Sequence, residues 1–167
     1  LSCAILSTAQ TVLADDAKLN VRADSLAFDY PLDEINQKIR QPHRIILDSK
    51  NQITHKHLQQ LALFQSHSPI TLVRIESTGE FAKLDYVKEV NSLWVESGST
   101  LAASFVEQQL FDELIVYIAP KIMGANAKEL LPVGPFTEMN QNIQLSLLEI
   151  THVGEDLRLS YIPDNKS

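Results

Sequence analysis

The sequence predicts an α/β fold, built on a mainly parallel β-sheet with antiparallel strands at its C-terminal end. Short apolar runs alternate with segments of helical spacing through most of the chain. Near the end, two strand patterns instead follow each other directly, which is typical of antiparallel strands. The length of 167 residues fits one domain, residues 1–167, and is enough to bury a sizeable apolar core.

Three strand patterns and one helical pattern are predicted in the first half. Residues 3–6 form a short apolar run that leads into a polar loop at residues 14–22. Residues 43–49 are rich in β-branched side chains and end in a turn, and residues 70–76 have the pattern of a buried strand. Between these two strands, residues 55–64 have a weak helical pattern.

The second half is predicted to continue the alternation and then to close with a hairpin. Its predicted elements are a helix over 82–90, a buried strand over 92–96, a helix over 99–109, a strand over 112–123, and two strands over 143–153 and 155–163. The hairpin is expected to turn at Gly154, Glu155 and Asp156, and residues 124–132 are expected to form a loop.

The composition argues against several classes of protein. The formal net charge of −7 is unfavourable for a general nucleic-acid surface, although a local basic site can still bind a small anion. Cys3 is the only cysteine, which excludes an internal disulfide and fits a reducing cytoplasm. His55, His57 and His67 do not have metal-ligand spacing, and no apolar run is long enough to cross a bilayer. We therefore predict neither a metal site nor a membrane partner.

Polar residues follow three of the predicted strands. Asp15 and Asp16 come after the first strand, Asp48 and Ser49 after the second, and residues 96–100 after the strand at 92–96. In sheets of this kind, ligands bind beyond the carboxyl ends of the strands. These strand ends are therefore the predicted binding site.

The turn at residues 96–104 combines a carboxylate with a glycine and a row of small residues. Gly98 lets a ligand approach the main chain, and Ser99 and Thr100 open a helix whose free N–H groups attract a phosphate. The alternative is an ordinary strand-to-helix turn with a serine cap. Because the turn has no G-x-G-x-x-G motif, a classical dinucleotide-binding fold is not predicted. Glu96 is either an exposed strand end or a hydrogen-bond acceptor for a polar substrate.

The segment at residues 11–22 also allows two interpretations. Asp15 and Asp16 can cap a turn, with Arg22 paired to one of them on the surface. Alternatively, Thr11 and Asp15 bind a cofactor while Arg22 clamps a phosphate with its planar guanidinium.

Together these segments resemble one protein family. The similarity is carried by three runs, AILSTAQTVLADDAKLNVR, RQPHRIILDS and LWVESGSTLAASFVEQQLFDELIVYIAPKIMGANAKELL. Their sequence, order and separation are similar to the reductase domain of the bacterial bifunctional riboflavin-biosynthesis deaminase/reductase, RibD. The resemblance covers essentially the whole chain and is weakest between residues 52 and 92.

The resemblance implies a dihydrofolate-reductase-like fold, a homodimer in the cytoplasm, and NADPH as cofactor. The implied reaction reduces the ribosyl group of 5-amino-6-(5-phospho-ribosylamino)uracil to a ribityl chain, by hydride transfer to C1 of the opened ribosylamine through its imine. The nicotinamide carries the hydride, so no catalytic side chain is predicted. The implied substrate contacts are Leu19, Arg22 and Glu96. The implied cofactor contacts are Thr11, Asp15, Ser49, Gly98, Ser99, Thr100, Leu101, Ala102, Ala103 and Ser104.

The chain also departs from the family pattern. Ala103 stands where many relatives have glycine, Ala17 stands where they have proline, and Gln52 stands where they often have a basic residue, with Lys50 as the candidate replacement. The family's first reductase strand, with a lysine and an S-x-DG motif, its arginine-rich helix and its zinc-dependent deaminase domain are not in this sequence. We therefore expect a domain truncated at its N-terminus. Two alternatives stay open: a non-catalytic fragment that binds NADPH or mediates dimer contacts, and a dihydrofolate-reductase-like enzyme with another substrate.

Overall fold

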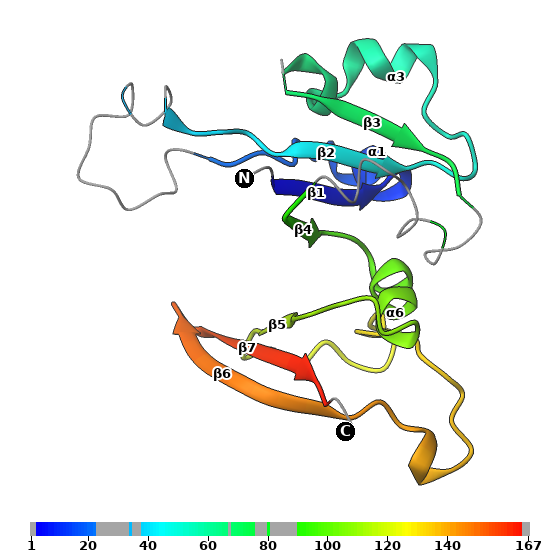
Figure 1. Cartoon of the computed structure of the whole chain (residues 1–167), viewed down its shortest axis with the longest axis vertical. Helices are drawn as coiled ribbons and strands as arrows, with labels where there is room; N and C mark the ends of the chain where they lie inside the picture. Colours follow the sequence, from blue (N-terminus) through cyan, green and yellow to red (C-terminus); the bar gives the residue numbers. More distant parts are fainter. Residues whose placement is uncertain are drawn as a thin grey trace. The chain divides into compact units, whose positions relative to one another are not determined.

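The computed structural model describes residues 3–22, 34, 38–66, 68–75, 80 and 90–164 (Figure 1). The chain divides into two compact units, Leu1–Gly98 and Ser99–Ser167. The boundary between them falls inside the turn that the sequence predicts to bind a cofactor.

The first unit is built on a four-stranded parallel sheet with the order β3-β2-β1-β4. Its strands are β1 (Cys3–Thr8), β2 (His43–Leu47), β3 (Ile70–Val73) and β4 (Ser92–Val95). Its helices are α1 (Ala9–Asp15), α3 (His55–Gln60) and the 3-10 helix η2 (Ala62–Gln65). Because neighbouring strands are parallel, their carboxyl ends lie at the same edge of the sheet.

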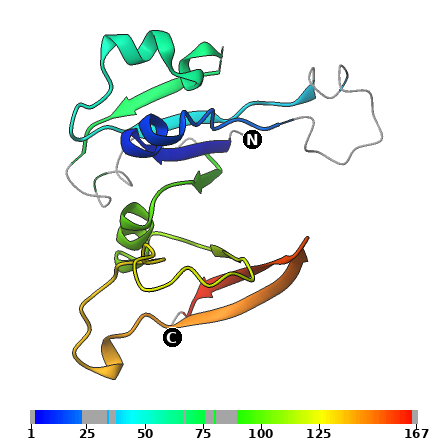
Figure 2. The same cartoon turned by 180° about the vertical axis from the view of Figure 1, so that it is seen from behind.

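The core of the first unit lies between this sheet and the helices that cover it. Figure 2 shows α1 in front of the strands. Apolar side chains from α1, β2, η2 and two loops pack into one buried cluster, made of Ala9, Val12, Leu19, Ile46, Ile53 and Leu63. The loop that follows α1 is thus tied to the core by Leu19.

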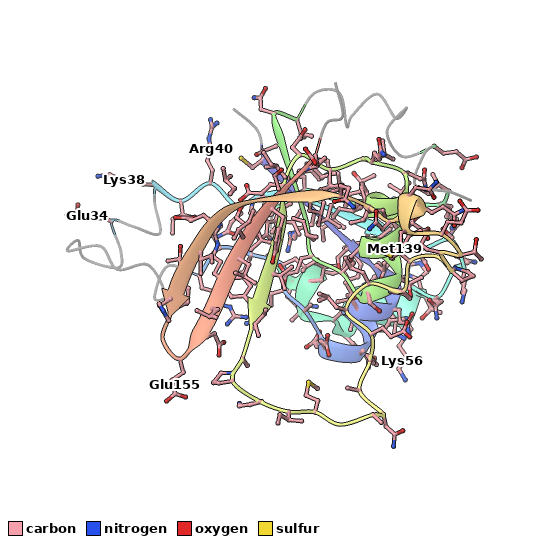
Figure 3. All side chains as sticks on the ribbon, turned by 90° about the horizontal axis from the view of Figure 1, so that it is seen from below. Glu34, Lys38, Arg40, Lys56, Met139 and Glu155 are labelled. Carbon is pink, nitrogen blue, oxygen red and sulfur yellow. The ribbon has the colours of Figure 1, made fainter. Side chains whose placement is uncertain are left out.

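The second unit is built on a three-stranded antiparallel sheet with the order β5-β7-β6. Its elements are α6 (Ser99–Glu107), β5 (Leu114–Ile118), the 3-10 helix η3 (Met139–Gln141), β6 (Leu145–Val153) and β7 (Asp156–Pro163). Gly154 opens the turn between β6 and β7 with a φ of 64°, a backbone conformation that favours glycine. The neighbouring Glu155 points away from the sheet (Figure 3).

The structure confirms the predicted α/β class, with its parallel sheet and its antiparallel C-terminal strands. It also confirms the helical pattern at 55–64 as α3 and η2, the helix that begins at Ser99, and the hairpin with its turn. The helix predicted over 82–90 lies outside the described residues except for Val90.

Three details of the prediction were wrong. A helix, α1, follows β1 directly, so Asp15 and Asp16 stand at the end of a helix and not at the end of a strand. The strand predicted over 112–123 ends at Ile118, just before Pro120, which has no N–H to donate to a strand ladder. The strand β4 is not buried: among the described strands it pairs with β1 alone, at the edge of the sheet, and Trp94 is 52% exposed.

Candidate functional site

Thr8 is the last residue of β1, and Thr11 and Asp15 follow it on α1. Thr8 is the N-cap of α1, where its Oγ1 accepts a hydrogen bond from the backbone N–H of Thr11 at 3.2 Å. The hydroxyls of Thr8 and Thr11 also lie 3.0 Å apart, within hydrogen-bonding distance. Asp15 stands one turn further along the helix and is exposed. Residues four apart on a helix share a face, so Thr11 and Asp15 are placed to contact one ligand.

The end of β2 holds two polar side chains with different roles. Asp48 is 1% exposed, and its two carboxylate oxygens accept hydrogen bonds from the backbone N–H groups of Gln52 at 2.7 Å and Ile53 at 3.1 Å. Asp48 therefore holds a turn together. Ser49 is exposed, and its hydroxyl donates to the carbonyl oxygen of Ile75 at 2.5 Å. The oxygen of Ser49 keeps lone pairs that can accept a hydrogen bond from a ligand.

A cavity of about 350 Å³ lies beside the loop that follows α1. Its lining residues are Ala17, Lys18, Leu19, Asn20, Val21, Arg22 and Glu96. The cavity thus brings together Leu19, Arg22 and Glu96, the three residues that the sequence predicts to contact a substrate.

Leu19 shapes this cavity through its backbone. Its φ is 49°, in the left-handed region that non-glycine residues rarely adopt. Its side chain is 6% exposed and packs in the apolar cluster with Val12 and Ile46. The side chain therefore anchors the loop, and the polar groups that Leu19 presents to the cavity are those of its main chain.

Glu96 stands on the wall contributed by the sheet. Its backbone N–H donates to the carbonyl oxygen of Leu6 at 2.9 Å, so the pairing with β1 continues one residue past β4. This bond holds the backbone of Glu96 at the carboxyl edge, while its side chain is exposed. Lys18 and Arg22 stand among the other lining residues. The cavity therefore offers cations for a phosphate and a carboxylate for N–H or O–H donors.

Arg44 on β2 supports the loop and was not predicted to matter. Its side chain is 1% exposed and donates to three carbonyl oxygens: those of Lys18 at 3.3 Å, Leu63 at 2.9 Å and Ser68 at 2.7 Å. Burial lowers the pKa of this guanidinium, and the three acceptors offset part of the cost of burying its charge. The signal in the sequence was a charged residue inside the otherwise apolar run of β2.

The predicted cofactor turn continues from Gly98 into α6. A Cβ added at Gly98 would meet no atom within 4 Å, and the φ of Gly98 is not in the left-handed region. The glycine is thus not required by the geometry of the turn, and its open surroundings fit the close approach of a ligand. Ala103 in α6 is 3% exposed, which leaves little surface for the predicted cofactor contact.

The part of the chain that the structure describes holds no cluster of three His, Cys, Asp or Glu side chains suited to a metal ion, and no helix in it is long and apolar enough to cross a membrane. Cys3 is exposed at the start of β1, where its Sγ accepts a hydrogen bond from the hydroxyl of Ser92 at 3.0 Å.

Comparison with known proteins accounts for this arrangement. The family described as RibD C-terminal domain matches residues 1–159. The chain belongs to this family. The match confirms the family resemblance of the three sequence runs.

Curated relatives agree with the RibD assignment. The chain is 39% identical to riboflavin biosynthesis protein RibD of Haemophilus influenzae, over 97% of this chain and 48% of that protein. It is 37% identical to RibD of Escherichia coli, over 96% of this chain and 49% of that protein. The chain therefore spans about half the length of these relatives. It is 31% identical to the 5-amino-6-(5-phosphoribosylamino)uracil reductase of Buchnera aphidicola subsp. Acyrthosiphon pisum, over 97% of this chain and 87% of that enzyme.

Solved RibD structures share the fold. Form 1 of Acinetobacter baumannii RibD superposes with a TM-score of 0.74 at 28% identity, over 98% of this chain and 47% of that one. Form 2 of the same protein gives a TM-score of 0.73 at 29% identity, over 97% and 47%. The α/β fold with a parallel and an antiparallel sheet is therefore that of the RibD reductases.

Proposed function

We propose that this chain reduces the ribosyl group of 5-amino-6-(5-phosphoribosylamino)uracil to a ribityl group with NADPH, as a reductase of riboflavin biosynthesis. The observation that carries the proposal is that Arg22 and Glu96 line the same cavity in a chain of the RibD C-terminal domain family. The Buchnera relative, most of whose length this chain covers, is named for reduction of this compound.

The chemistry of the cavity supports a phosphorylated pyrimidine as substrate. The guanidinium of Arg22 suits a phosphate, because its planar fork can donate two parallel hydrogen bonds to phosphate oxygens. An ionised Glu96 only accepts hydrogen bonds, which suits the N–H groups of uracil or the hydroxyls of the sugar. The backbone of Leu19, held in its left-handed conformation, supplies further polar groups between the two. These residues bind and orient the substrate.

Each unit, taken by itself, has features that fit a dinucleotide cofactor. In the first unit, Thr11 and Ser49 carry hydroxyl groups on the segments that follow the carboxyl ends of β1 and β2, where such ligands bind, and Asp15 stands one turn after Thr11 on α1. Gly98 leaves open space beside the main chain, and Ser99 begins a helix of nine residues whose first N–H groups suit a phosphate. When bound, NADPH supplies a hydride for C1 of the opened sugar. The chain's own task is to hold and orient the reactants.

The direct test mixes the purified chain with NADPH and 5-amino-6-(5-phosphoribosylamino)uracil and follows the loss of nicotinamide absorbance. We expect oxidation of NADPH that depends on both the protein and the substrate, and slower oxidation with the dephosphorylated substrate. Binding of NADPH without oxidation would favour a non-catalytic fragment. Oxidation with other pyrimidine or pterin compounds, but not with this one, would favour a related reductase of different specificity.

A further inference from the structure

The loop at residues 16–22 forms most of the cavity wall but contains no helix or strand. Its shape is therefore set by groups outside the loop that satisfy its backbone and side chains. Two contacts hold its first half: Arg44 donates to the carbonyl oxygen of Lys18 at 3.3 Å, and the backbone N–H of Ala62 donates to Oδ1 of Asp16 at 2.8 Å. Both come from the core side of the loop.

The second half of the loop is held by Gln41. The backbone N–H of Val21 donates to Oε1 of Gln41 at 2.9 Å, and Nε2 of Gln41 donates to the carbonyl oxygen of Val21 at 3.1 Å. The carboxamide thus pairs with both polar groups of one residue, as a neighbouring strand would. Gln41 is exposed and does not line the cavity.

These two bonds fix both peptide groups that flank Val21. The N–H belongs to the peptide group between Asn20 and Val21, and the C=O belongs to the one between Val21 and Arg22. Each peptide group is planar, so orienting the second one fixes the direction in which the Cα of Arg22 leaves the loop. Gln41 therefore acts on the position of Arg22 without contacting the cavity.

We propose that Gln41 is a positioning residue, which holds the loop in the conformation in which Arg22 lines the cavity and so sets the affinity for the phosphorylated substrate. The substrate side of this inference rests on the proposed function. Without Gln41, the loop would have to be ordered when the substrate binds, and that ordering would weaken binding. The chemical step would be unchanged once the substrate is bound.

The first arm of the test needs no activity. Hydrogen–deuterium exchange of the Val21 amide is compared in the wild-type chain, Gln41→Ala and Gln65→Ala. Gln65 is the matched control, because it is an exposed glutamine whose Nε2 also donates to a backbone carbonyl, that of Gln59 at 2.8 Å. Loss of one hydrogen bond predicts about tenfold faster exchange in Gln41→Ala and no change at Val21 in Gln65→Ala.

A third variant, Gln41→Glu, should give an intermediate exchange rate at the Val21 amide. Gln41→Glu keeps an acceptor for the Val21 N–H but has no donor for the Val21 carbonyl, so its exchange rate should fall between those of the wild type and Gln41→Ala. Exchange at Val21 that is the same in the wild type and Gln41→Ala would overturn the proposal.

The second arm measures the kinetics of the proposed reaction. For Gln41→Ala we expect KM for the uracil phosphate to rise about tenfold while kcat stays within about twofold, because binding of the substrate and of the transition state is weakened equally. A merely structural role would instead lower the amount of folded enzyme, reducing the apparent kcat and leaving KM unchanged. In an Arg22→Ala background, Gln41→Ala should change KM no further, since the two residues act through one contact.

The two arms separate the failure of this inference from the failure of the proposed function. A wild-type chain that does not reduce the uracil phosphate would contradict the proposed function, and exchange at Val21 would still decide whether Gln41 holds the loop. An active wild type with an unchanged KM in Gln41→Ala would contradict the positioning role alone.

Discussion

At the scale of single residues, the protonation of His43 is coupled to folding. It begins β2, and its Nε2 lies 2.8 Å from the hydroxyl oxygen of Thr71 on β3. Burial, and to a lesser extent the neighbouring charge of Arg44, lowers the pKa of His43 below its usual value of 6.5. The folded protein therefore binds this proton more weakly than the unfolded chain does.

This shift predicts a loss of stability in mild acid. As the pH falls below about 6.5, the unfolded chain takes up the proton first, and the free energy of unfolding decreases until the pH passes below the folded-state pKa. His43→Gln removes this titration and keeps a hydrogen-bonding group, so its urea midpoint should depend less on pH across that window. Urea unfolding at a series of pH values measures how steeply the urea midpoint depends on pH. His152 is exposed, and His152→Gln serves as the control. If the urea midpoint depends equally on pH in the wild type and in His43→Gln, His43 does not cause the loss of stability.

The grouping of two site residues on one cavity could be predicted from the sequence, and their roles stay predictions. Arg22 and Glu96 were both assigned to a substrate from the sequence, and the structure places both on one cavity. Arg44 and Asp48 show the limit of such reasoning, since each is 1% exposed and bonds to backbone groups. Their roles depend on burial, which is created by contacts between segments far apart in the sequence.

At the scale of elements, strongly patterned segments were predictable and short or exposed ones were not. The hairpin of β6 and β7 and the helix α6 follow from periodicity and a glycine turn. The helix α1 has seven residues, too few to show a clear period, and it was missed. The sequence SLWV of β4 is apolar enough to suggest burial, but the strand lies at a sheet edge, which its own residues do not encode.

The junction between β4 and α6 gives a prediction at this scale. Gly98→Val adds a branched side chain beside the N-terminus of α6, where the structure leaves open space, so the variant should fold normally. We expect its dissociation constant for NADPH to rise more than about tenfold, or about 1.4 kcal/mol, because the side chain would occupy the space proposed for the cofactor. Titration of NADPH fluorescence measures this, with the melting temperature as the control for folding. Unchanged affinity in a folded variant would rule out a cofactor contact at Gly98.

At the scale of the whole molecule, the antiparallel sheet of the second unit leaves apolar side chains in contact with solvent. Ile118, Leu147 and Ile150 pair with alternate residues of β7, so they share one face of the sheet. They are 47%, 50% and 56% exposed. Exposed apolar groups on one face favour association, and a second copy of the chain is the simplest partner because a two-fold dimer is closed.

We therefore predict that the chain self-associates. Sedimentation velocity at micromolar concentrations should show a dimer for the wild type. Ile150→Glu should shift the distribution towards monomer, because it would bury a charge in the contact. A wild-type monomer at high micromolar concentration would contradict this prediction.

The measurement that tests the central claim most directly is a paired one on Arg22→Ala and Glu96→Gln. Both side chains are assigned to the substrate and neither to the cofactor. Losing one charge-assisted hydrogen bond costs about 1.5–3 kcal/mol, so kcat/KM for the uracil phosphate should fall at least about tenfold in each variant. NADPH affinity, measured on the same preparations, should stay within about threefold.

Matched controls come from charged residues that are not among those lining the cavity. Arg40, whose side chain extends away from the ribbon, and Glu155, in the hairpin turn, are exposed (Figure 3). Arg40→Ala and Glu155→Gln should leave kcat/KM unchanged. A tenfold or larger loss of kcat/KM confined to Arg22→Ala and Glu96→Gln, at constant NADPH affinity, is the result that this account predicts. Unaltered turnover in those two variants, or loss of NADPH binding with the fold intact, would contradict it.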